Sequence, residues 1–127
     1  MAEATEPAAV VQRLRGAYES GITRSLEWRD AQLQGVVDFL TDFTPQLTTA
    51  MYEDLGRPEM EAWVADIGPS ISEATYVQKH FRSWAKPRRA SVSLVAQPGR
   101  AEILPEPLGV SLIIAPWNYP VNLVFEP

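Results

Sequence analysis

The sequence predicts an α/β fold: an N-terminal helical segment and a β-hairpin arm that lead into the first strand of a parallel sheet. Three observations support this prediction. Apolar residues recur at helical spacing through residues 1–90, and residues 91–106 hold two alternating stretches around the turn signal Gln97-Pro98-Gly99. Within residues 107–127, the apolar, β-branched run 109–115 is typical of a strand buried on both faces, which usually belongs to a parallel sheet.

Three helices are predicted in the first half of the chain because each has a start or a stop signal. Hydroxyl caps and Pro mark the starts, and Gly marks the stops. The starts are Thr5 with Pro7, Ser25, and Thr44 with Pro45, and the stops are Gly21 and Gly56. The stripes expected to pack into the core are Val10, Val11, Leu14, Ala17 and Tyr18, then Trp28, Leu33, Val36, Val37, Leu40 and Phe43, then Leu47, Ala50, Met51 and Leu55.

A fourth helical region follows Pro58 and contains a second proline. The residues on one predicted face are Met60, Trp63, Val64 and Ile67, continued by Ile71, Ala74, Phe81 and Trp84. Pro69 has no N–H, and its ring would clash with the carbonyl of Ala65 at a cost of about 3 kcal/mol in a regular helix. Ser70 and Glu73 fit a capping box, so we expect the helix to kink or restart there.

The composition excludes several classes of protein. A net charge of −5 disfavours nucleic acid and anionic membranes as partners. The chain has no Cys, which excludes disulfides and a Cys nucleophile within the chain, and its single His disfavours a His-based metal site. No apolar run approaches the ~20 residues needed to span a bilayer. The N-terminus lacks the basic and apolar regions of a signal peptide, so we predict a cytoplasmic protein without a transmembrane segment.

Three side chains directly follow the predicted strand. Pro116 ends strand pairing because it has no N–H, and Pro120 favours a helix that starts directly after it. Trp117, Asn118 and Tyr119 would lie between them at the carboxyl end of the strand, where open α/β sheets bind ligands. The amide of Asn118 is an uncharged donor that can face a developing oxyanion. The alternative is that Asn118 only satisfies backbone groups of the loop, as Asn often does in turns.

The stretch that begins at Glu106 resembles the signature of a known enzyme family. It reads Glu-Pro-Leu-Gly-Val-x-Leu-Ile-Ile-x-Pro-Trp-Asn-Tyr-Pro, which is similar to the NAD(P)-dependent aldehyde dehydrogenases, and Trp-Asn-Tyr-Pro resembles their class 3-like branch. Other matching segments are Leu26-Glu-Trp-Arg29, Asp54-Leu-Gly-Arg-Pro58 and Lys86-Pro-Arg-Arg89. The resemblance implies an incomplete aldehyde dehydrogenase fold, in which residues 107–127 begin a Rossmann-like NAD(P)-binding domain.

The resemblance also implies roles for individual residues. Asn118 would be the catalytic oxyanion donor, facing the tetrahedral species that forms from an aldehyde and a Cys thiolate. Tyr119 would be the substrate-binding residue that walls the aldehyde tunnel. The residues that would line the cleft for NAD or NADP are Ile114, Ala115, Pro116 and Trp117. The hairpin of residues 91–106 would belong to the oligomerisation arm of a homodimer. Pro69 stands near the place where the family has a bulky residue that helps to shape the aldehyde tunnel, so the sequence departs from the family pattern there.

The implied function is oxidation of aldehydes to carboxylic acids with NAD or NADP, but parts of that machinery are missing from the sequence. There is no Cys to act as nucleophile and no second Gly-rich turn to hold a pyrophosphate. We therefore expect an N-terminal fragment that is inactive alone. The alternative is a non-catalytic helical interaction module, or a relic, derived from the same family.

Overall fold

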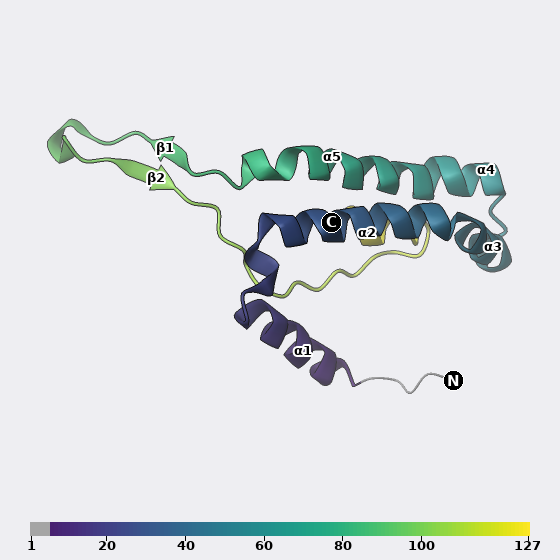
Figure 1. Ribbon diagram of the computed structural model, residues 1–127. Coiled ribbons are helices and arrows are strands. Elements are labelled where there is room, and N and C mark those ends of the chain that lie inside the picture. The colour runs from purple at the N-terminus through teal and green to yellow at the C-terminus, as the bar shows by residue number, and fades with distance from the viewer. Residues whose placement is uncertain (1–5) are drawn as a thin grey trace.

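The computed structural model describes residues 6–127, which form helices and one small sheet (Figure 1). The helices are α1 (Pro7–Glu19), α2 (Leu26–Asp42), α3 (Thr44–Leu55), α4 (Glu59–Ala62), α5 (Gly68–Trp84) and α6 (Asn122–Phe125). The shorter turns are the 3₁₀ turns η1 (Ile22–Arg24) and η3 (Leu94–Ala96) and the π-helical turn η2 (Trp63–Ile67). The strands are β1 (Arg88–Ala90) and β2 (Ala101–Ile103).

Helices α2 and α5 lie side by side and antiparallel (Figure 1). Residues near the start of α2 meet residues near the end of α5: Arg82 Nη1 lies 3.2 Å from Glu27 Oε1. Further along, the Gln78 amide donates to Gln34 Oε1 at 3.3 Å. A backbone hydrogen bond and the Arg82 guanidinium hold the pKa of Glu27 below its ordinary value. The other elements that contact this pair of helices are α3, α6, η1 and η2.

The core lies at the end of the α2–α5 pair that is nearest α3. Its buried residues are Leu40, Met51, Ala62, Ile67 and Val121. Four of the five come from α2, α3, α4 and η2, whereas Val121 comes from the C-terminal stretch of the chain and is 6% exposed. Burial of Val121 therefore fastens the segment ahead of α6 to the helices.

Three of the predicted helix signals are confirmed, and the first is Gly21, which follows the end of α1 with φ 80°. Ser25 is the N-cap of α2, and its hydroxyl accepts a hydrogen bond from the Trp28 N–H at 3.0 Å. Gly56 ends α3 with φ 66°, a left-handed conformation that favours Gly. The prediction for Thr44 is wrong, because its hydroxyl donates to the Leu40 carbonyl and so belongs to the preceding turn. The proposed cap Thr5 lies outside the described residues.

The apolar face of α1 is not buried, so the prediction that it packs into the core is wrong. Leu14 is 46% exposed and Val11 37%. Within residues 6–127, α1 reaches the rest of the chain mainly through η1 and Tyr18, and Figure 1 shows it directed away from the α2–α5 pair. An amphipathic stripe indicates which face of a helix can pack, but not whether a neighbour covers it.

A kink or restart is expected at Pro69, and the helix does restart there: the π-helical turn η2 ends at Ile67, and α5 begins at Gly68 with Pro69 in its first turn. The Gly68 N–H donates to the Trp63 carbonyl, five residues back, so the hydrogen-bond pattern widens just before the proline. The capping box, in contrast, is absent: the Ser70 hydroxyl donates to the Asp66 carbonyl at 2.7 Å. The extra residue in the turn also rotates the helix faces, which explains why Met60, expected on the buried face with Ile67, is 73% exposed.

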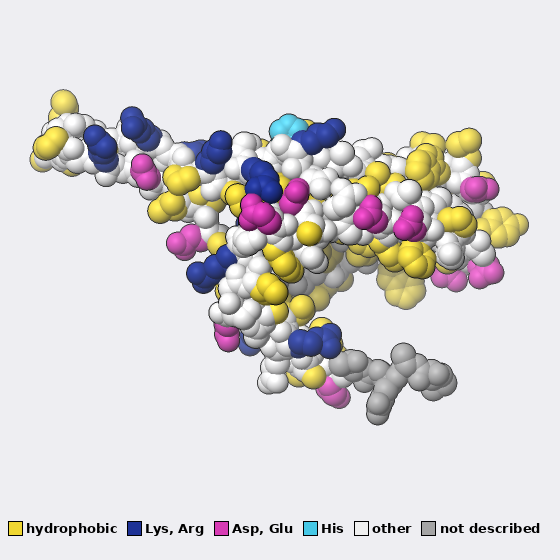
Figure 2. Space-filling view, in the orientation of Figure 1, with side chains coloured by type: hydrophobic (Ala, Val, Ile, Leu, Met, Phe, Trp, Pro, Cys, Tyr) yellow, Lys and Arg dark blue, Asp and Glu magenta, His cyan; other side chains and the backbone are white. Residues whose placement is uncertain are grey.

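A hairpin forms, but its paired strands differ from the expected ones. β1 pairs antiparallel with β2, with Arg88 opposite Ile103 and Ala90 opposite Ala101. Pairing thus ends before residue 91, and the stretch expected to alternate contains the 3₁₀ turn η3 instead. The hairpin projects beyond the end of α5, with Lys and Arg side chains along it and hydrophobic side chains at its end (Figures 1 and 2).

Residues 109–115 do not form a strand, in contrast to the prediction. Leu112 is 84% exposed and Ile114 85%. A strand requires a neighbour for its backbone N–H and C=O groups, and among residues 6–127 the two paired strands are β1 and β2. The segment therefore leads from the hairpin to α6 as irregular chain. Of the helices that the structure describes, none is both long enough and apolar enough to cross a bilayer.

Candidate functional site

The loop that leads into α6 carries the residues predicted to act in catalysis. Trp117 and Asn118 form a turn directly ahead of Tyr119 and Pro120. Trp117 is 86% exposed and Tyr119 37%, and Asn118 is also exposed. The Tyr119 carbonyl accepts from the Leu123 N–H at 3.1 Å, so the predicted helix start after Pro120 is confirmed.

Asp66 anchors the far end of this loop. It lies in η2 and is completely buried. Its Oδ1 accepts hydrogen bonds from the backbone N–H groups of Val121 at 3.0 Å and Asn122 at 2.7 Å. A buried carboxylate needs partners of this kind, since the loss of its water shell is otherwise costly. The two N–H groups belong to the first turn of α6, so Asp66 fixes where that helix begins.

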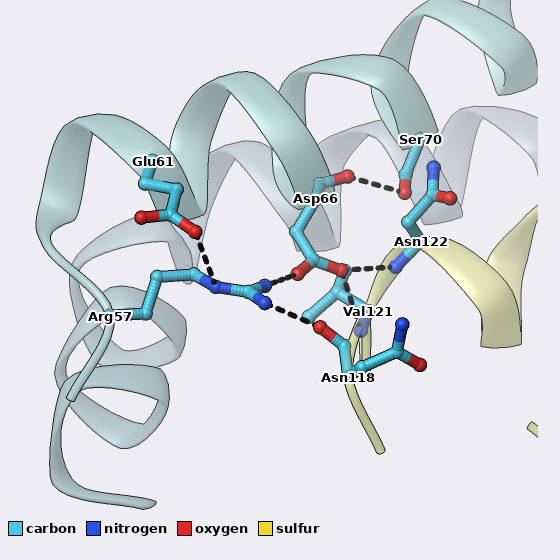
Figure 3. Close-up of polar contacts among 7 residues, drawn as sticks. All are labelled: Arg57, Glu61, Asp66, Ser70, Asn118, Val121 and Asn122. Carbon is cyan, nitrogen blue, oxygen red and sulfur yellow. Dashed lines mark hydrogen bonds and ion pairs between the residues drawn. The ribbon is translucent and has the colours of Figure 1, made fainter. Parts of the chain in front are cut away.

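Arg57 anchors the near end of the loop and also pairs with Asp66 (Figure 3). Its Nη1 binds the second carboxylate oxygen, Oδ2, and its Nη2 donates to the backbone carbonyl of Asn118. The guanidinium carbon lies 4.9 Å from the centre of the Tyr119 ring, within the range of a cation–π contact. The Arg57 side chain is 9% exposed, and its remaining nitrogen, Nε, lies 3.5 Å from the exposed carboxylate of Glu61.

The side chain of Asn118 is left free by these contacts. Among the described residues it makes no hydrogen bond, and Figure 3 shows its amide directed away from Arg57. The group that satisfies the loop is therefore the Asn118 carbonyl, not the amide. This arrangement leaves an uncharged donor at the surface of a loop held from both sides.

An apolar hollow of about 540 Å³ lies on another side of the same loop. Its lining includes Leu47, Met51 and Leu55 of α3 together with Trp117, Pro120 and Val121. The structure thus brings Trp117 against α3, whereas Tyr119, predicted to wall a substrate tunnel, lies against Arg57 and does not line this hollow.

The four residues predicted to line a cofactor cleft form an open surface in this chain. Ile114 is 85% exposed, and Ala115 is half-buried beside the exposed Pro116. All four side chains, including Trp117, are uncharged, so they suit the uncharged parts of a dinucleotide and offer no cation for its phosphates. Residues 114–117 could therefore form one wall of such a site.

Sequence reasoning missed Arg57 and Asp66 as parts of this site. In the sequence, Arg57 stands out only as part of the segment Asp54-Leu-Gly-Arg-Pro58, which resembles the family but indicates no role for the residue. Asp66 carried a detectable signal, because it is a charged residue directly beside Ile67 in an apolar helical region. A charged residue at a buried position is almost always paired, and the nearest candidate of opposite charge is Arg57, nine positions earlier.

Comparison with known proteins identifies the same family along almost the whole chain. The family model described as "Aldehyde dehydrogenase family" matches residues 1–126. The chain is 44% identical over 117 residues to "Aldehyde dehydrogenase family 3 member B1" of Mus musculus, with 92% of this chain and 25% of that protein covered. It is 38% identical over 122 residues to "Aldehyde dehydrogenase family 3 member I1, chloroplastic" of Arabidopsis thaliana, with 96% of this chain and 22% of the relative covered.

A solved structure is similar in fold as well. The chain superposes on "Substrate bound state of Staphylococcus Aureus AldH" with a TM-score of 0.85 and 30% sequence identity, over 88% of this chain and 24% of that one. The chain thus spans about a quarter of the length of the relatives it matches. Its helices and two-stranded antiparallel sheet correspond to part of an aldehyde dehydrogenase fold. The chain belongs to the aldehyde dehydrogenase family, and its relatives are those of the class 3-like branch.

Proposed function

We propose that this chain forms the N-terminal part of an NAD(P)-dependent aldehyde dehydrogenase, which oxidises aldehydes to carboxylic acids, and that Asn118 donates a hydrogen bond to the oxyanion of the reaction. The observation that carries this proposal is the free amide of Asn118, on a loop whose backbone is held by Arg57 and Asp66. A donor carried on a backbone that is already fixed in place needs little reorganisation when charge develops on the substrate.

In the proposed reaction, a thiolate from outside this chain attacks the carbonyl carbon of the aldehyde. The electron pair of the C=O bond moves onto oxygen, which becomes the oxyanion that the Asn118 Nδ2–H group faces. An amide suits this position because it donates a hydrogen bond without giving up its proton. The bound cofactor would supply the oxidising power by accepting a hydride, and water would then hydrolyse the resulting thioester, which gives the carboxylic acid and frees the thiolate. Ile114, Ala115, Pro116 and Trp117 would contact its uncharged part, and Tyr119 would contact the aldehyde.

The hairpin is the proposed contact with a second subunit. At its end, Leu94 is 91% exposed and Val95 97%. Among the described residues, β1 and β2 form a sheet of two strands. The outer edge of each strand therefore has backbone groups that are available to pair with another chain. We therefore assign the hairpin to the oligomerisation arm of a homodimer. The same exposed arm favours the second candidate, a non-catalytic module that binds a partner protein.

The test is a chimera in which this chain replaces the matching quarter of the mouse family 3 member B1. The chimera should oxidise aldehydes with NAD or NADP, whereas this chain alone should give no turnover because it has no Cys. Asn118→Ala in the chimera should lower kcat by about 10²–10³, the usual effect of removing one oxyanion donor. The affinity for the cofactor, measured by titration with the fluorescent reduced form of the cofactor, should change little.

A matched control is Gln78→Ala, which removes an amide of α5 that binds Gln34 across the helix pair, away from the loop. This variant should keep normal turnover. A well-folded chimera without activity would favour the non-catalytic module. Near-normal turnover of Asn118→Ala would reject the oxyanion role and leave the family membership untouched.

A further inference from the structure

Two charged residues hold the Asn118 loop at both ends, and we call Arg57 and Asp66 the loop clamp. Arg57 binds the carbonyl of Asn118, and Asp66 binds the N–H groups of Val121 and Asn122. Because Arg57 and Asp66 also bind each other, the two ends of the loop are tied to one rigid unit. The clamp joins positions 55 to 61 residues apart in the sequence.

The peptide bond between Asn118 and Tyr119 is held by contacts on both residues. Arg57 fixes the direction of the Asn118 carbonyl. Its guanidinium carbon also lies 4.9 Å from the centre of the Tyr119 ring, and this contact restricts the side chain of the residue that follows Asn118. Three residues later, Asp66 fixes the N–H of Val121, whose side chain is buried in the core. A rotation of the backbone at Asn118 would break at least one of these contacts. The clamp therefore sets the direction in which the Asn118 side chain leaves the backbone.

The burial of this ion pair is not accounted for by stability alone. Asp66 is completely buried and the Arg57 side chain is 9% exposed. Removing two charges from water carries a desolvation penalty that often exceeds their attraction, and well-packed apolar residues of similar volume stabilise a fold as well or better. What apolar residues cannot do is bind a carbonyl on one side and two N–H groups on the other. The pair therefore provides directional contacts that position the loop.

We propose that Arg57 and Asp66 are positioning residues for the oxyanion donor: they act through the orientation of Asn118 and not through contact with the substrate. This inference rests on the proposed function of Asn118. A donor displaced by about 1 Å can lower a rate by about 10², so loss of the clamp should weaken catalysis even though neither residue touches the reacting atoms.

Single substitutions are poor tests because they leave one buried charge without its partner and destabilise the fold. The informative variant is Arg57→Met together with Asp66→Leu, which removes both charges and keeps apolar volume. The matched control is Glu61→Gln, because Glu61 also lies near Arg57 but its side chain is 59% exposed. In the chain itself, the double variant should keep its melting temperature within a few degrees, while amide exchange at Val121 and Asn122 should accelerate by about tenfold or more. Unchanged exchange in a folded double variant would overturn the positioning role.

Turnover in the chimera tests whether the clamp acts through Asn118. The double variant should lower kcat by about 10–10², with the affinity for cofactor nearly unchanged. In an Asn118→Ala background the same double substitution should lower kcat by less than about threefold, because two changes that remove one interaction are not additive. Fully additive losses would overturn the inference while the oxyanion role stands.

The turnover of Asn118→Ala separates the inference from the proposed function. If Asn118→Ala alone keeps near-normal turnover, the proposed function fails, and the exchange rates at Val121 and Asn122 still decide whether the clamp positions the loop.

Arg57→Lys tests the geometry of the clamp, because it keeps the charge but loses the planar fork that reaches two acceptors. It should therefore still pair with Asp66 but lower kcat, and a kcat for Arg57→Lys equal to that of the unsubstituted chimera would overturn the two-acceptor geometry.

Discussion

The Tyr18 hydroxyl donates a hydrogen bond to the carbonyl oxygen of Pro107 at 2.8 Å and so joins positions 89 residues apart in the sequence. The same ring lies beside Gly109, where an added Cβ would come within 3.8 Å of Tyr18 Cε1. Gly109 has φ 104°, a conformation that L-residues with a side chain rarely adopt. Tyr18 therefore docks the end of α1 onto the start of the segment that carries the candidate site.

Tyr18→Phe tests this docking contact. Removal of the hydroxyl should lower the free energy of unfolding by about 0.5–1.5 kcal/mol, the usual net contribution of one hydrogen bond. Amide exchange in α1 should accelerate, because none of the residues of α1 is buried and little else holds the helix. Tyr52→Phe is the control, since Tyr52 is 64% exposed and should tolerate the change. Equal effects of the two substitutions in urea unfolding would contradict the role given to Tyr18.

A second prediction concerns the π-helical turn ahead of Pro69. A Cβ on Gly68 would lie 3.0 Å from the Trp63 carbonyl oxygen, tighter than ordinary contact, whereas a Cβ on Gly35 in α2 would have no neighbour within 4 Å. Gly35→Ala should raise the free energy of unfolding by about 0.5–1 kcal/mol because Ala favours a helix interior. Gly68→Ala should show no such gain. Stabilisation of equal size at both positions, measured by thermal unfolding, would mean that the π-helical turn adjusts to the added Cβ at little cost in free energy.

The parts of the fold that could be predicted are those fixed by near neighbours in the sequence. Ser25 caps α2 through Trp28, three residues away, and Gly56 ends α3 by its own conformation, so both are visible in a short window. The loop of Asn118 between two prolines was recognisable for the same reason. The clamp was not, because the partners of Asp66 include Val121 and Asn122, 55 and 56 positions away, and a hydrophobic pattern says nothing about such pairs.

The predictions for residues 109–115 and for the apolar face of α1 failed for one physical reason, which is that both assumed a neighbour. The pattern of residues 109–115 indicates that both faces suit burial, but strand formation depends on a partner for the backbone. The face of α1 was predicted to be buried on the same assumption. At Pro69 the expected restart is observed, and the π-helical turn η2 is how the chain accommodates the missing N–H, since α5 begins directly after it.

The exposed apolar side chains of residues 109–115 predict self-association of this chain. Leu112→Gln with Ile114→Gln should reduce binding of a hydrophobic dye and reduce association measured by sedimentation velocity, because these side chains are 84% and 85% exposed. The melting temperature should hardly change. Leu94→Gln with Val95→Gln is the comparison at the end of the hairpin. Association that responds only to the hairpin pair would assign it to the hairpin instead.

The last prediction uses charge to test what Asn118 faces. Asn118→Asp keeps the size of the side chain but replaces a donor by a carboxylate, which is ionised at neutral pH and only accepts hydrogen bonds. Beside a developing oxyanion, this change removes a favourable contact and adds repulsion between like charges. In the chimera, kcat should therefore fall at least as far as in Asn118→Ala, where the loss corresponds to about 2.7–4 kcal/mol.

A purely structural role of Asn118 predicts the opposite order. The carbonyl that Arg57 binds is a backbone group, so Asn118→Asp leaves that contact in place. Asp also suits turns as well as Asn does. If Asn118 served only the loop, Asn118→Asp should thus be milder than Asn118→Ala in turnover, cofactor affinity and melting temperature. Because a transition-state contact affects kcat much more than ground-state binding, the three quantities measured on both variants separate a donor to the oxyanion from a residue of the turn.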